Sequence, residues 1–432
     1  MATSWPRSSA PRVLGEAGSP TGWYPVARSA EVRTTPVPVG AAGRAYVVVR
    51  LRPGAEVTAL SARCPHRLVP LATAAVVDGR LECPHHGWQF NAEGRCVEIP
   101  SLGPDGTPPP RADLSAPWAV EERDGWVWLA PERTPVARPP RLGGRTPAPE
   151  PVPAPPAPDG PVFGNLDPAL ERAWHPVAPA GELVEGGYVQ VRLLGRTWTV
   201  HRRDGVLDAD PPAWGVVERL GMVWIAPAEP REELLDVPAA ADGRATAVWL
   251  APARSAAPAG LLADAFLDVS RTRRPLAQEV PAYEVTPEPG GFSSVLEQDG
   301  MRVTLRYRAP FQLLRVEELA GGAVRTVLRL LQPEDADSTR LHTCLLLQGA
   351  GGAAVAPADV VAAEVGSQEA LLAEELARQA TADGTGLPLQ LRDELHVRAD
   401  RLGVALRRAL ADLAADAAVA ERAADLERRA SA

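Results

Sequence analysis

Apolar and polar residues alternate along many short stretches of the chain, and this alternation is typical of half-buried β-strands. Between residues 23 and 131 such runs, for example 44–49, are separated by Gly and Pro turns and predict a small all-β domain. Alternation over 302–307 and 325–330 predicts further strands in the C-terminal half. Near the end, a helix over 404–429 for packing or assembly is predicted by the spacing of Leu406, Leu410, Leu413, Val419 and Leu426.

Two stretches lack such a pattern. Residues 1–20 are polar and rich in Pro, Ser and Gly, so we expect a disordered tail. Residues 132–161 hold many prolines and predict a semi-rigid extended linker, with a Pro-rich docking ligand as the alternative.

A sequence repeat spans the linker. The opening motif WYPVA at 23–27 returns as WHPVA at 174–178, and the closing motif at 118–131 returns at 214–227. The anchors lie 95 positions apart in the first copy and 40 in the second, so the second copy lacks about 55 residues. We therefore expect the second copy to keep a β core without the chemistry of the first, and His175 and His201 to be ordinary residues.

The missing residues are those that carry a pattern of cysteine and histidine. Cys64 and His66 form a C-x-H pair, and Cys83 and His86 form a C-x-x-H pair sixteen residues after the first. A Rieske [2Fe–2S] cluster needs two Cys thiolates on one iron and two neutral imidazoles on the other, so each of two loops supplies one of each. Neutral imidazoles raise the cluster's potential to roughly −150 to +300 mV, from about −400 mV for all-Cys plant-type clusters.

A structural zinc site is the alternative for these four residues, since two Cys and two His also suit tetrahedral zinc. Zinc fingers favour C-x-x-C and H-x₃₋₅-H pairs, whereas here each pair mixes the two ligand types. His85 stands one residue early for the ligand spacing, and we expect it to be a loop residue.

Both loops resemble known sequences. RCPHR at 63–67 and CPHHGWQF at 83–90 are similar to the cluster loops of ring-hydroxylating oxygenases and their Rieske ferredoxins. In the C-terminal half, AFLDVSR at 265–271 resembles the N-F-L-D-x-x-H segment of Rieske non-haem iron oxygenases, particularly the vanillate demethylase-like branch. The stretch 387–401 resembles the closing region of that branch.

The resemblance implies an α+β protein. We expect an all-β Rieske domain over 21–131, a degenerate Rieske-like β domain without a cluster over 162–230, and a helix-grip, oxygenase-like domain with a C-terminal helix over 231–432. The tail and the Pro-rich linker complete the domain organisation.

The mononuclear iron ligands of that family are not matched. In the family a D-x-x-H-x₄-H segment gives two His ligands and a later Asp completes the facial triad for Fe(II). Here Arg271 and Leu276 stand at the His positions and Leu372 at that of the Asp, and neither an Arg nor a Leu side chain can donate a lone pair to iron. A register shift would instead place one of three carboxylates there: Glu369, Glu374 or Glu375.

Asp268 survives at the position that, in the family, bridges a neighbouring subunit's Rieske His to the iron. It is therefore a candidate for the electron path or, equally, a structural residue beside a helix. His342 and His396 are the other candidates for a rebuilt iron site, and we expect both to be structural.

The composition and net charge of the chain argue against several classes of protein. The chain has 432 residues with 45% hydrophobic content and a net charge of −9, so it can bury two or three cores, and nucleic acid or anionic membrane is not expected as a partner. No apolar run approaches the ~20 residues of a membrane span. Beyond the motif only Cys96 and Cys344 remain, too few for a disulfide framework, which favours a reducing cytoplasm.

Three functions remain open. The first is an electron carrier that keeps the [2Fe–2S] cluster without a mononuclear Fe(II), with an NAD(P)H-dependent flavin or iron–sulfur reductase or a ferredoxin as donor. Its acceptor would be an intact Rieske oxygenase subunit, in a trimer or mixed trimer. The second is a working monooxygenase or demethylase for a small aromatic or natural-product substrate. The third is a ligand-binding scaffold or redox sensor.

Overall fold

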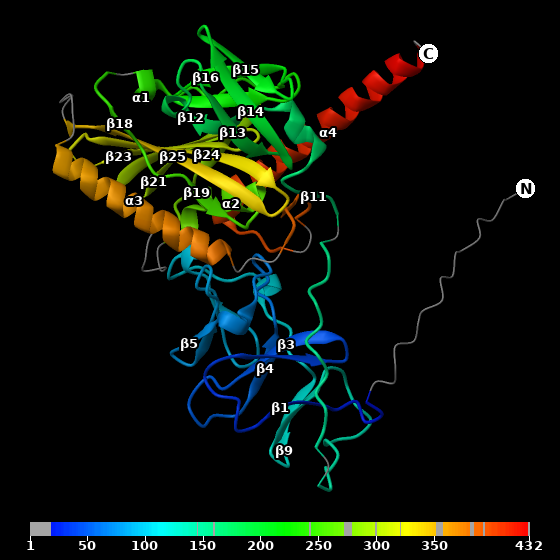
Figure 1. Cartoon of the computed structure of the whole chain (residues 1–432). Helices are drawn as coiled ribbons and strands as arrows, with labels where there is room; N and C mark the ends of the chain where they lie inside the picture. The colour runs from blue at the N-terminus through cyan, green and yellow to red at the C-terminus, as the bar shows by residue number, and fades with distance from the viewer. Residues whose placement is uncertain are drawn as a thin grey trace, which may run out of the picture. The chain divides into compact units, whose positions relative to one another are not determined.

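The computed structural model in Figure 1 describes residues 19–430 apart from 145, 159, 242, 272–278, 299, 320, 351–356, 381–383 and 392–393. The chain divides into two compact units. The first unit runs to Pro156 without the short segment Pro100–Asp105, and the second unit consists of that segment and the chain from Ala157 onward. Both consist mostly of strands, and the described helices of four residues or more all belong to the second unit.

The first unit contains three small antiparallel sheets, with strand orders β1-β10-β9, β2-β3-β4 and β5-β6-β7-β8. Tight turns of positive φ join the paired strands, as at Ala42 and Gly43 with φ of 51° and 69°. Its strands are β1 (Tyr24–Arg28), β2 (Val37–Ala41), β3 (Arg44–Val49), β4 (Thr58–Ser61), β5 (Ala75–Val77), β6 (Arg80–Glu82), β7 (Gln89–Phe90), β8 (Cys96–Glu98), β9 (Ala119–Arg123) and β10 (Trp126–Ala130).

The Pro-rich segment up to Pro156 packs along the first unit. The indole Nε1 of Trp23 donates to the carbonyl of Val136 at 2.9 Å, and the Leu142 amide donates to Asp124 at 3.1 Å. Glu150 forms an isolated β-bridge with Gly40 of β2. This part of the predicted linker is therefore held against the β-sheets.

The second unit opens with two three-stranded sheets, β12-β17-β16 and β13-β14-β15. The first of these repeats the pairing of β1-β10-β9, including a register shift between Pro176 and Ala178 that matches the shift between Pro25 and Ala27. The strands are β12 (His175–Pro179), β13 (Tyr188–Leu193), β14 (Arg196–Arg203), β15 (Val206–Asp210), β16 (Gly215–Arg219) and β17 (Met222–Ala226).

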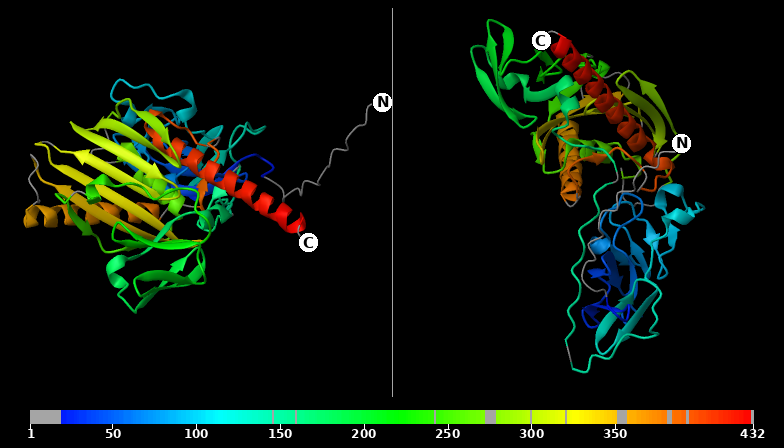
Figure 2. Two further views of the ribbon diagram at one scale, coloured as in Figure 1. Left: turned by 90° about the horizontal axis from the view of Figure 1, so that it is seen from above. Right: turned by 90° about the vertical axis from the view of Figure 1, so that its right-hand side faces the viewer.

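An eight-stranded antiparallel sheet forms the centre of the second unit (Figure 2). Its order is β18-β25-β24-β23-β22-β21-β20, with β19 also paired to β25. The strands are β18 (Thr246–Trp249), β19 (Ala253–Ser255), β20 (Glu284–Glu288), β21 (Gly291–Gln298), β22 (Met301–Arg308), β23 (Gln312–Glu318), β24 (Val324–Asp335) and β25 (Ser338–Gln348), while β11 (Val162–Phe163) pairs separately with β26 (Leu387–Pro388). Predicted strands 302–307 and 325–330 lie within β22 and β24.

The two faces of this sheet are covered by different elements. Because side chains alternate along a strand, Leu328 and Leu330 of β24 point to one face, where they pack with Trp224 of β17. Leu331 points to the other face and belongs to the same core as Leu402 and Leu406 of the C-terminal helix. The helices of this unit are α1 (Pro238–Ala241), α2 (Ala259–Phe266), α3 (Ala358–Gln379) and α4 (Arg401–Ala430), with short 3₁₀ turns in both units at Leu71–Thr73, Pro100–Leu102, Pro110–Ala112, Pro168–Arg172, Ala180–Glu182, Val269–Arg271 and Arg398–Asp400.

Helix α4 begins three residues earlier than the hydrophobic spacing predicts. Its buried stripe is Leu402, Leu406, Leu410 and Leu413. Val419, a later residue of the predicted stripe, is 60% exposed within this chain, because the second half of the helix extends past the sheet. No helix within the described ranges is long and apolar enough to cross a membrane.

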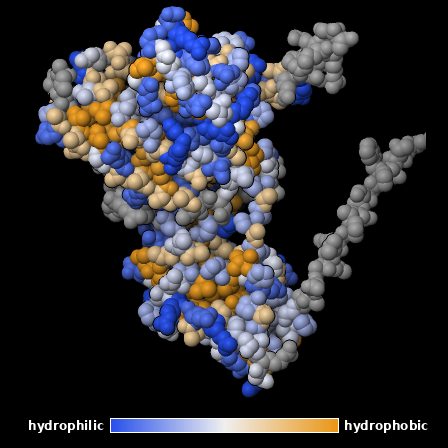
Figure 3. Space-filling view, viewed as in Figure 1, coloured by the Kyte–Doolittle hydropathy of each residue, from blue (hydrophilic) through white to orange (hydrophobic). Residues whose placement is uncertain are grey.

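Apolar side chains reach the surface in both units. Figure 3 shows hydrophobic residues gathered over β5 and along α3, where Val77, Val360 and Leu371 are exposed.

Candidate metal centre

Two loops of the first unit carry the cysteine and histidine pairs, one between β4 and β5 and one between β6 and β7. Both loops close with the same hydrogen bonds. The amide of Leu68 donates to the carbonyl of Cys64, and the amide of Gly87 donates to that of Cys83, at 2.9 and 3.0 Å. The return bonds run from the Cys64 amide to the Val69 carbonyl and from the Cys83 amide to the Trp88 carbonyl. The two loops are therefore local copies of each other.

Each loop turns through a left-handed residue at the same offset from its cysteine. Gly87 has φ of 69°, a conformation that costs glycine nothing, whereas Leu68 adopts φ of 53°. A non-glycine residue there is strained, and the Arg63 guanidinium donates to the Leu68 carbonyl at 2.6 Å.

The loops bring all four predicted ligand side chains into one buried site. Cys64 and Cys83 are 0% and 1% exposed, and His66 and His86 are 2% and 6% exposed. The two imidazole rings lie edge to face with their centroids 4.3 Å apart. Burial and the neighbouring Cys83 raise the pKa of the Cys64 thiol. Two soft sulfur donors and two imidazoles in one enclosed site fit a Rieske cluster, which takes two protein ligands per iron.

Trp88 completes this site, and the sequence motif alone did not indicate its role. Its indole lies parallel to the His66 ring, 6° from coplanar and 4.6 Å between centroids, and it is 1% exposed. The stack fixes the plane of one imidazole. The sequence signal that could have found it is the position of an aromatic residue directly after the left-handed Gly87.

The other cysteines and His85 occupy different surroundings. His85 is half-buried, with its ring centroid 6.1 Å from that of His86. Cys96 interacts with the Glu98 carbonyl at 3.6 Å, and burial raises the pKa of the Cys96 thiol to about 12. None of the four cysteines forms a disulfide in the described structure.

Within the first unit, the family model for the Rieske [2Fe-2S] domain matches residues 22–115. These residues are a Rieske domain. The domain begins just before β1, contains both loops, and ends before β9.

Known proteins match part of the chain. The chain is 45% identical over 75 residues to the chloroplastic protein TIC 55 of Arabidopsis thaliana, covering 17% of this chain and 14% of that protein. It is 36% identical over 110 residues to chlorophyllide a oxygenase of Chlamydomonas reinhardtii, covering 25% and 16%. It is 37% identical over 109 residues to the oxygenase subunit of 3-chlorobenzoate-3,4-dioxygenase from Comamonas testosteroni, covering 25% of each. The chain is thus homologous to Rieske oxygenases, although each match spans a quarter or less of the relative's length.

Solved structures align over more of the chain but less closely. A mutant of NdmA from Pseudomonas putida CBB5 is 18% identical, with a TM-score of 0.39 and coverage of 89% of this chain and 88% of that chain. Apo dicamba monooxygenase is 15% identical, with a TM-score of 0.37 and coverage of 92% and 98%.

The predicted residues of the C-terminal half are only partly described. Asp268 is 5% exposed and accepts hydrogen bonds from the amide and hydroxyl of Ser270, at 3.0 and 2.6 Å. The side chain of Arg271 and the whole of Leu276 lie outside the described residues. Leu372 is buried on α3.

Of the carboxylates that a register shift would bring to the position of Leu372, one shares its buried face. Glu375 is 7% exposed and accepts from Arg378 at 2.7 Å and from Gln379 at 3.0 Å. Glu369 and Glu374 are exposed. In the part of the chain that the structure describes, no three His, Cys, Asp or Glu side chains are grouped to hold a single metal ion.

The remaining predicted structural histidines have partners in the fold. His342 Nε2 lies 2.9 Å from the Gln332 side-chain oxygen, and burial lowers the pKa of His342 to about 3. His396 lies 3.3 Å from Glu394. His175 Nε2 lies 2.7 Å from the Leu170 carbonyl, and burial lowers the pKa of His175 to about 4.

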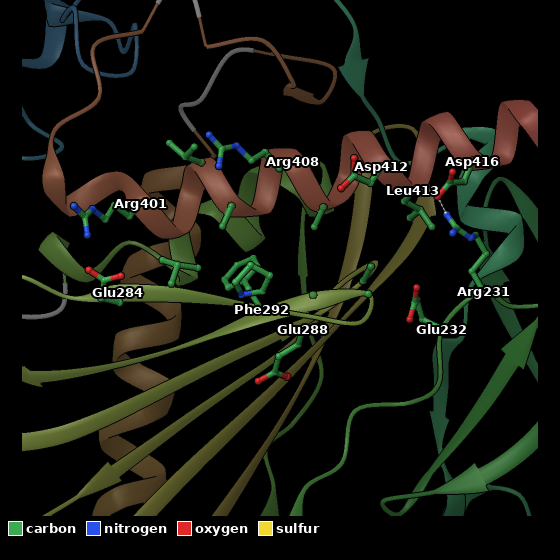
Figure 4. Close-up of a pocket in the computed structure, with 18 of the residues that line it drawn as sticks. Arg231, Glu232, Glu284, Glu288, Phe292, Arg401, Arg408, Asp412, Leu413 and Asp416 are labelled. Carbon is green, nitrogen blue, oxygen red and sulfur yellow. Dashed lines mark hydrogen bonds and ion pairs between the residues drawn. The ribbon is translucent and has the colours of Figure 1, made fainter.

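A groove of about 700 Å³ lies between α4 and the strands β20 and β21 (Figure 4). Its floor is apolar, with Phe292 beneath the helix, and its rim mixes Arg, Glu and Asp. Arg231 is paired with Asp416 across the rim, and Arg401 donates to the Tyr283 carbonyl at 2.6 Å. Among the described residues that line the groove, the ionisable side chains are those of Arg, Asp and Glu, and none is a Cys, His or Tyr.

Proposed function

We propose that Cys64, His66, Cys83 and His86 hold a Rieske [2Fe–2S] cluster. The observation that carries this proposal is the meeting of two buried thiols and two imidazoles on matched loops of a Rieske domain. Bound there, the cluster supplies one-electron transfer at a potential raised by its neutral imidazole ligands. The chain's own contribution is to keep the thiols from water and, through Trp88, to hold the His66 ring in one plane.

We further propose that this chain has no mononuclear iron of its own. The support is chemical, because Arg271 has no lone pair to offer a metal and Leu276 and Leu372 have no donor atoms. Glu375, the described carboxylate nearest in register on the buried face of α3, is already bonded to Arg378 and Gln379. The chain would then deliver electrons to a partner rather than activate oxygen.

We also propose which domains follow the Rieske domain and which branch of the oxygenase family the chain resembles. The repeated register shift in β12 supports a second, cluster-free Rieske-like β region over 162–230. An antiparallel sheet with α4 packed on one face is consistent with a helix-grip domain of the vanillate demethylase-like branch. Asp268 is the candidate for an electron-path residue.

A carrier of this kind needs two partners. We propose an NAD(P)H-dependent flavin or iron–sulfur reductase, or a ferredoxin, as donor, and an intact Rieske oxygenase subunit as acceptor in a trimer or mixed trimer. Val77 and Val97 are exposed on the sheet β5-β6-β7-β8, in which the second cysteine and histidine loop joins β6 to β7. Exposed apolar side chains of this kind suit transient contacts with a partner protein. The compartment we propose is the reducing cytoplasm, where cysteines that form no disulfide, like the four described here, are the rule.

A functional oxygenase is the second candidate, and the relatives favour it. The chain is similar over about a quarter of its length to chlorophyllide a oxygenase and to the oxygenase subunit of 3-chlorobenzoate-3,4-dioxygenase. In that case the substrate would be a small aromatic compound or a natural product, and iron would be held by residues other than those at the family positions.

The test combines the purified holoprotein with a reductase, NADH and O₂, with and without an intact Rieske oxygenase encoded near it. We expect no substrate oxidation by the chain alone and a raised turnover of the partner in the mixture. Cys83→Ser should remove this stimulation while the two chains still assemble, and His85→Ala should leave it unchanged. Substrate oxidation by the chain and reductase alone would establish the oxygenase function instead.

A further inference from the structure

A second, smaller cavity of about 310 Å³ opens in the second unit, between the β region over 162–230 and the large sheet. One wall carries Arg254 of β19 and Arg340 of β25. The other wall carries Gln190 and Arg192 of β13 and Thr197 of β14. Its volume lies at the lower end of the range of about 300–1,000 Å³ that is usual for small-molecule sites.

Two of these arginines lie side by side. Arg254 and Arg340 are directly opposite each other in the pairing of β19 with β25. The Nη2 of Arg254 and the Nε of Arg340 both donate to one oxygen, Oε1 of Glu334, each at 2.9 Å. Like charges at opposed positions destabilise a sheet, so this pair is held together by the Glu334 carboxylate, which is 4% exposed.

Glu334 does not need both cations. Arg254 already donates to its two oxygens, from Nε at 2.8 Å and from Nη2 at 2.9 Å, and the Ser338 hydroxyl donates to it at 2.9 Å. Burial raises the pKa of Glu334, but these bonds and the charges of Arg254 and Arg340 outweigh burial and lower the pKa overall. The ionised carboxylate therefore provides one negative charge to two positive charges.

The ends of both guanidinium groups are available to a ligand. Among the described residues, none accepts from Nη1 of Arg254 or from Nη1 and Nη2 of Arg340. The two side chains are 61% and 31% exposed, and both line the cavity, so a ligand can reach them from solvent. Arg192 differs, because it is bound to Asp335 through Nε and Nη2 and to Thr197 through Nη1.

The donors match a ligand with more than two oxygens. The terminal edge of Arg340 offers two parallel N–H groups, which fit two oxygens of a carboxylate or a phosphate. On the other wall the Thr197 hydroxyl accepts from Arg192 and can donate its own proton, and the exposed Gln190 amide offers two N–H groups. A carboxylate has two oxygens in one plane, whereas a phosphate group has three or four that diverge and can meet donors on both walls.

Acidic residues around the cavity balance its arginines. Asp335 pairs with Arg192, and Glu334 neutralises one of the other two cations. The remaining negative charge is that of Glu182, an exposed residue of the lining that forms no ion pair with a described residue. Water screens an exposed carboxylate strongly, so Glu182 should weaken the binding of an anion without preventing it.

We propose that Arg254 and Arg340 bind a phosphate group in this cavity, either free inorganic phosphate or the phosphate of a small monoester, with Thr197 and Gln190 on its far side. Such a ligand would join the β region over 162–230 to the large sheet, because its donors come from both. The cavity contains no residue of the Rieske domain, and the proposed electron transfer does not require this ligand.

Calorimetric titration of the full-length holoprotein with inorganic phosphate, in a phosphate-free buffer of fixed ionic strength, measures this binding. We expect one saturable site per chain with a Kd of about 1 mM or lower, and binding of acetate, the control anion, at least about tenfold weaker. Absence of saturable phosphate binding, or equal binding of acetate, would overturn the proposal.

Methyl phosphate distinguishes the two sources of the phosphate group. Binding of this ester as tight as that of inorganic phosphate would identify a monoester as the ligand, and weaker binding would identify free phosphate. Both results agree with the proposal.

Four variants locate the site. Arg340→Lys keeps a positive charge beside Glu334 but removes the free terminal edge, so phosphate affinity should fall at least about tenfold. Arg254→Gln should also lower the affinity, and Glu182→Gln should raise it by about twofold or more, since it removes a nearby negative charge. Arg203→Gln, an exposed arginine of β14 outside the cavity, is the matched control and should leave the affinity unchanged.

These variants separate phosphate binding from a structural role. If Arg340 served only to stabilise Glu334, Arg340→Lys would leave the phosphate affinity unchanged, and that result would contradict the proposal. Glu182→Gln changes an exposed side chain, so it tests the site even where an arginine variant fails to fold, and an unchanged affinity there would equally contradict it. Every variant should keep the cluster's spectrum, because no residue of the first unit is altered.

Discussion

The two β regions at 23–130 and 174–226 share a framework and differ in what is inserted into it. Both contain one three-stranded sheet with the same strand order and the same register shift after a proline, at Pro25 and at Pro176. In both, a tryptophan of the last strand donates its indole N–H to the carbonyl five residues earlier, at 3.2 Å for Trp128 and 2.9 Å for Trp224.

Only the first region contains the sheet β5-β6-β7-β8 and the two loops of cysteine and histidine. In the second region β15 is followed directly by β16. The β framework therefore forms with or without the part that carries metal chemistry. Sequence variation can remove that part while the packing of the framework persists.

Of the substitutions that distinguish the two β regions, Cys64→Ser in the first region should have the largest effect, on the cluster content of the protein. Loss of one thiolate ligand should abolish the Rieske EPR signal and the inorganic sulfide of the protein, because a hydroxyl is a poor ligand for the cluster. Cys344→Ala, in the second unit, is the matched control and should leave both unchanged. Retention of a Rieske signal by Cys64→Ser would contradict the ligand assignment.

The next largest effect concerns the matched tryptophans. Trp224→Ala should lower the free energy of unfolding by about 3–5 kcal/mol, and Trp128→Ala by less. Trp224 packs with Leu328 and Leu330 of the large sheet, whereas Trp128 packs in a smaller cluster with Trp23 and Trp126. Urea unfolding followed by circular dichroism measures both variants. An equal or larger loss of unfolding free energy for Trp128→Ala would contradict the expectation that Trp224 contributes more to stability than Trp128.

These particulars show how far the sequence could predict the structure. The repeat, many of the strands and the meeting of Cys64, His66, Cys83 and His86 could be predicted, because alternation, turn residues and residue spacing are local in sequence. The Trp88 stack and the approach of Arg254 to Glu334 could not, since they depend on how strands and loops distant in the chain pack together. The end of the buried stripe on α4 depends on where the sheet ends.

A smaller effect, of pH on the free energy of unfolding, is expected from His175 in the second copy of the repeat. Burial lowers the pKa of His175 to about 4, while Tyr24 occupies the matching position in the first copy. A histidine whose folded pKa is depressed stabilises the fold above its unfolded pKa of about 6.5, and this stability is lost as pH falls towards 4. The loss should be about 3 kcal/mol.

His175→Gln tests this because an amide can still donate to the Leu170 carbonyl without titrating. Unfolding free energies measured between pH 7 and pH 4 should fall less steeply for this variant than for the unchanged protein. An unchanged slope in His175→Gln would assign the acid sensitivity to other groups.

The smallest effect concerns the two ligand loops. Leu68→Gly should relieve the left-handed strain of its loop and stabilise the holoprotein by about 1 kcal/mol or less. Gly87→Ala should cost about 1 kcal/mol at the equivalent position. The temperature at which the cluster's absorption is lost on heating measures both, and a rise for Gly87→Ala would contradict the equivalence of the loops.

Counting iron and inorganic sulfide in the anaerobically purified protein tests the central claim most directly. The account predicts two irons and two sulfides per chain, with an EPR signal of mixed Cys and His ligation on reduction. Three irons per chain would contradict the absence of a mononuclear site, and zinc in place of iron would contradict the Rieske cluster itself.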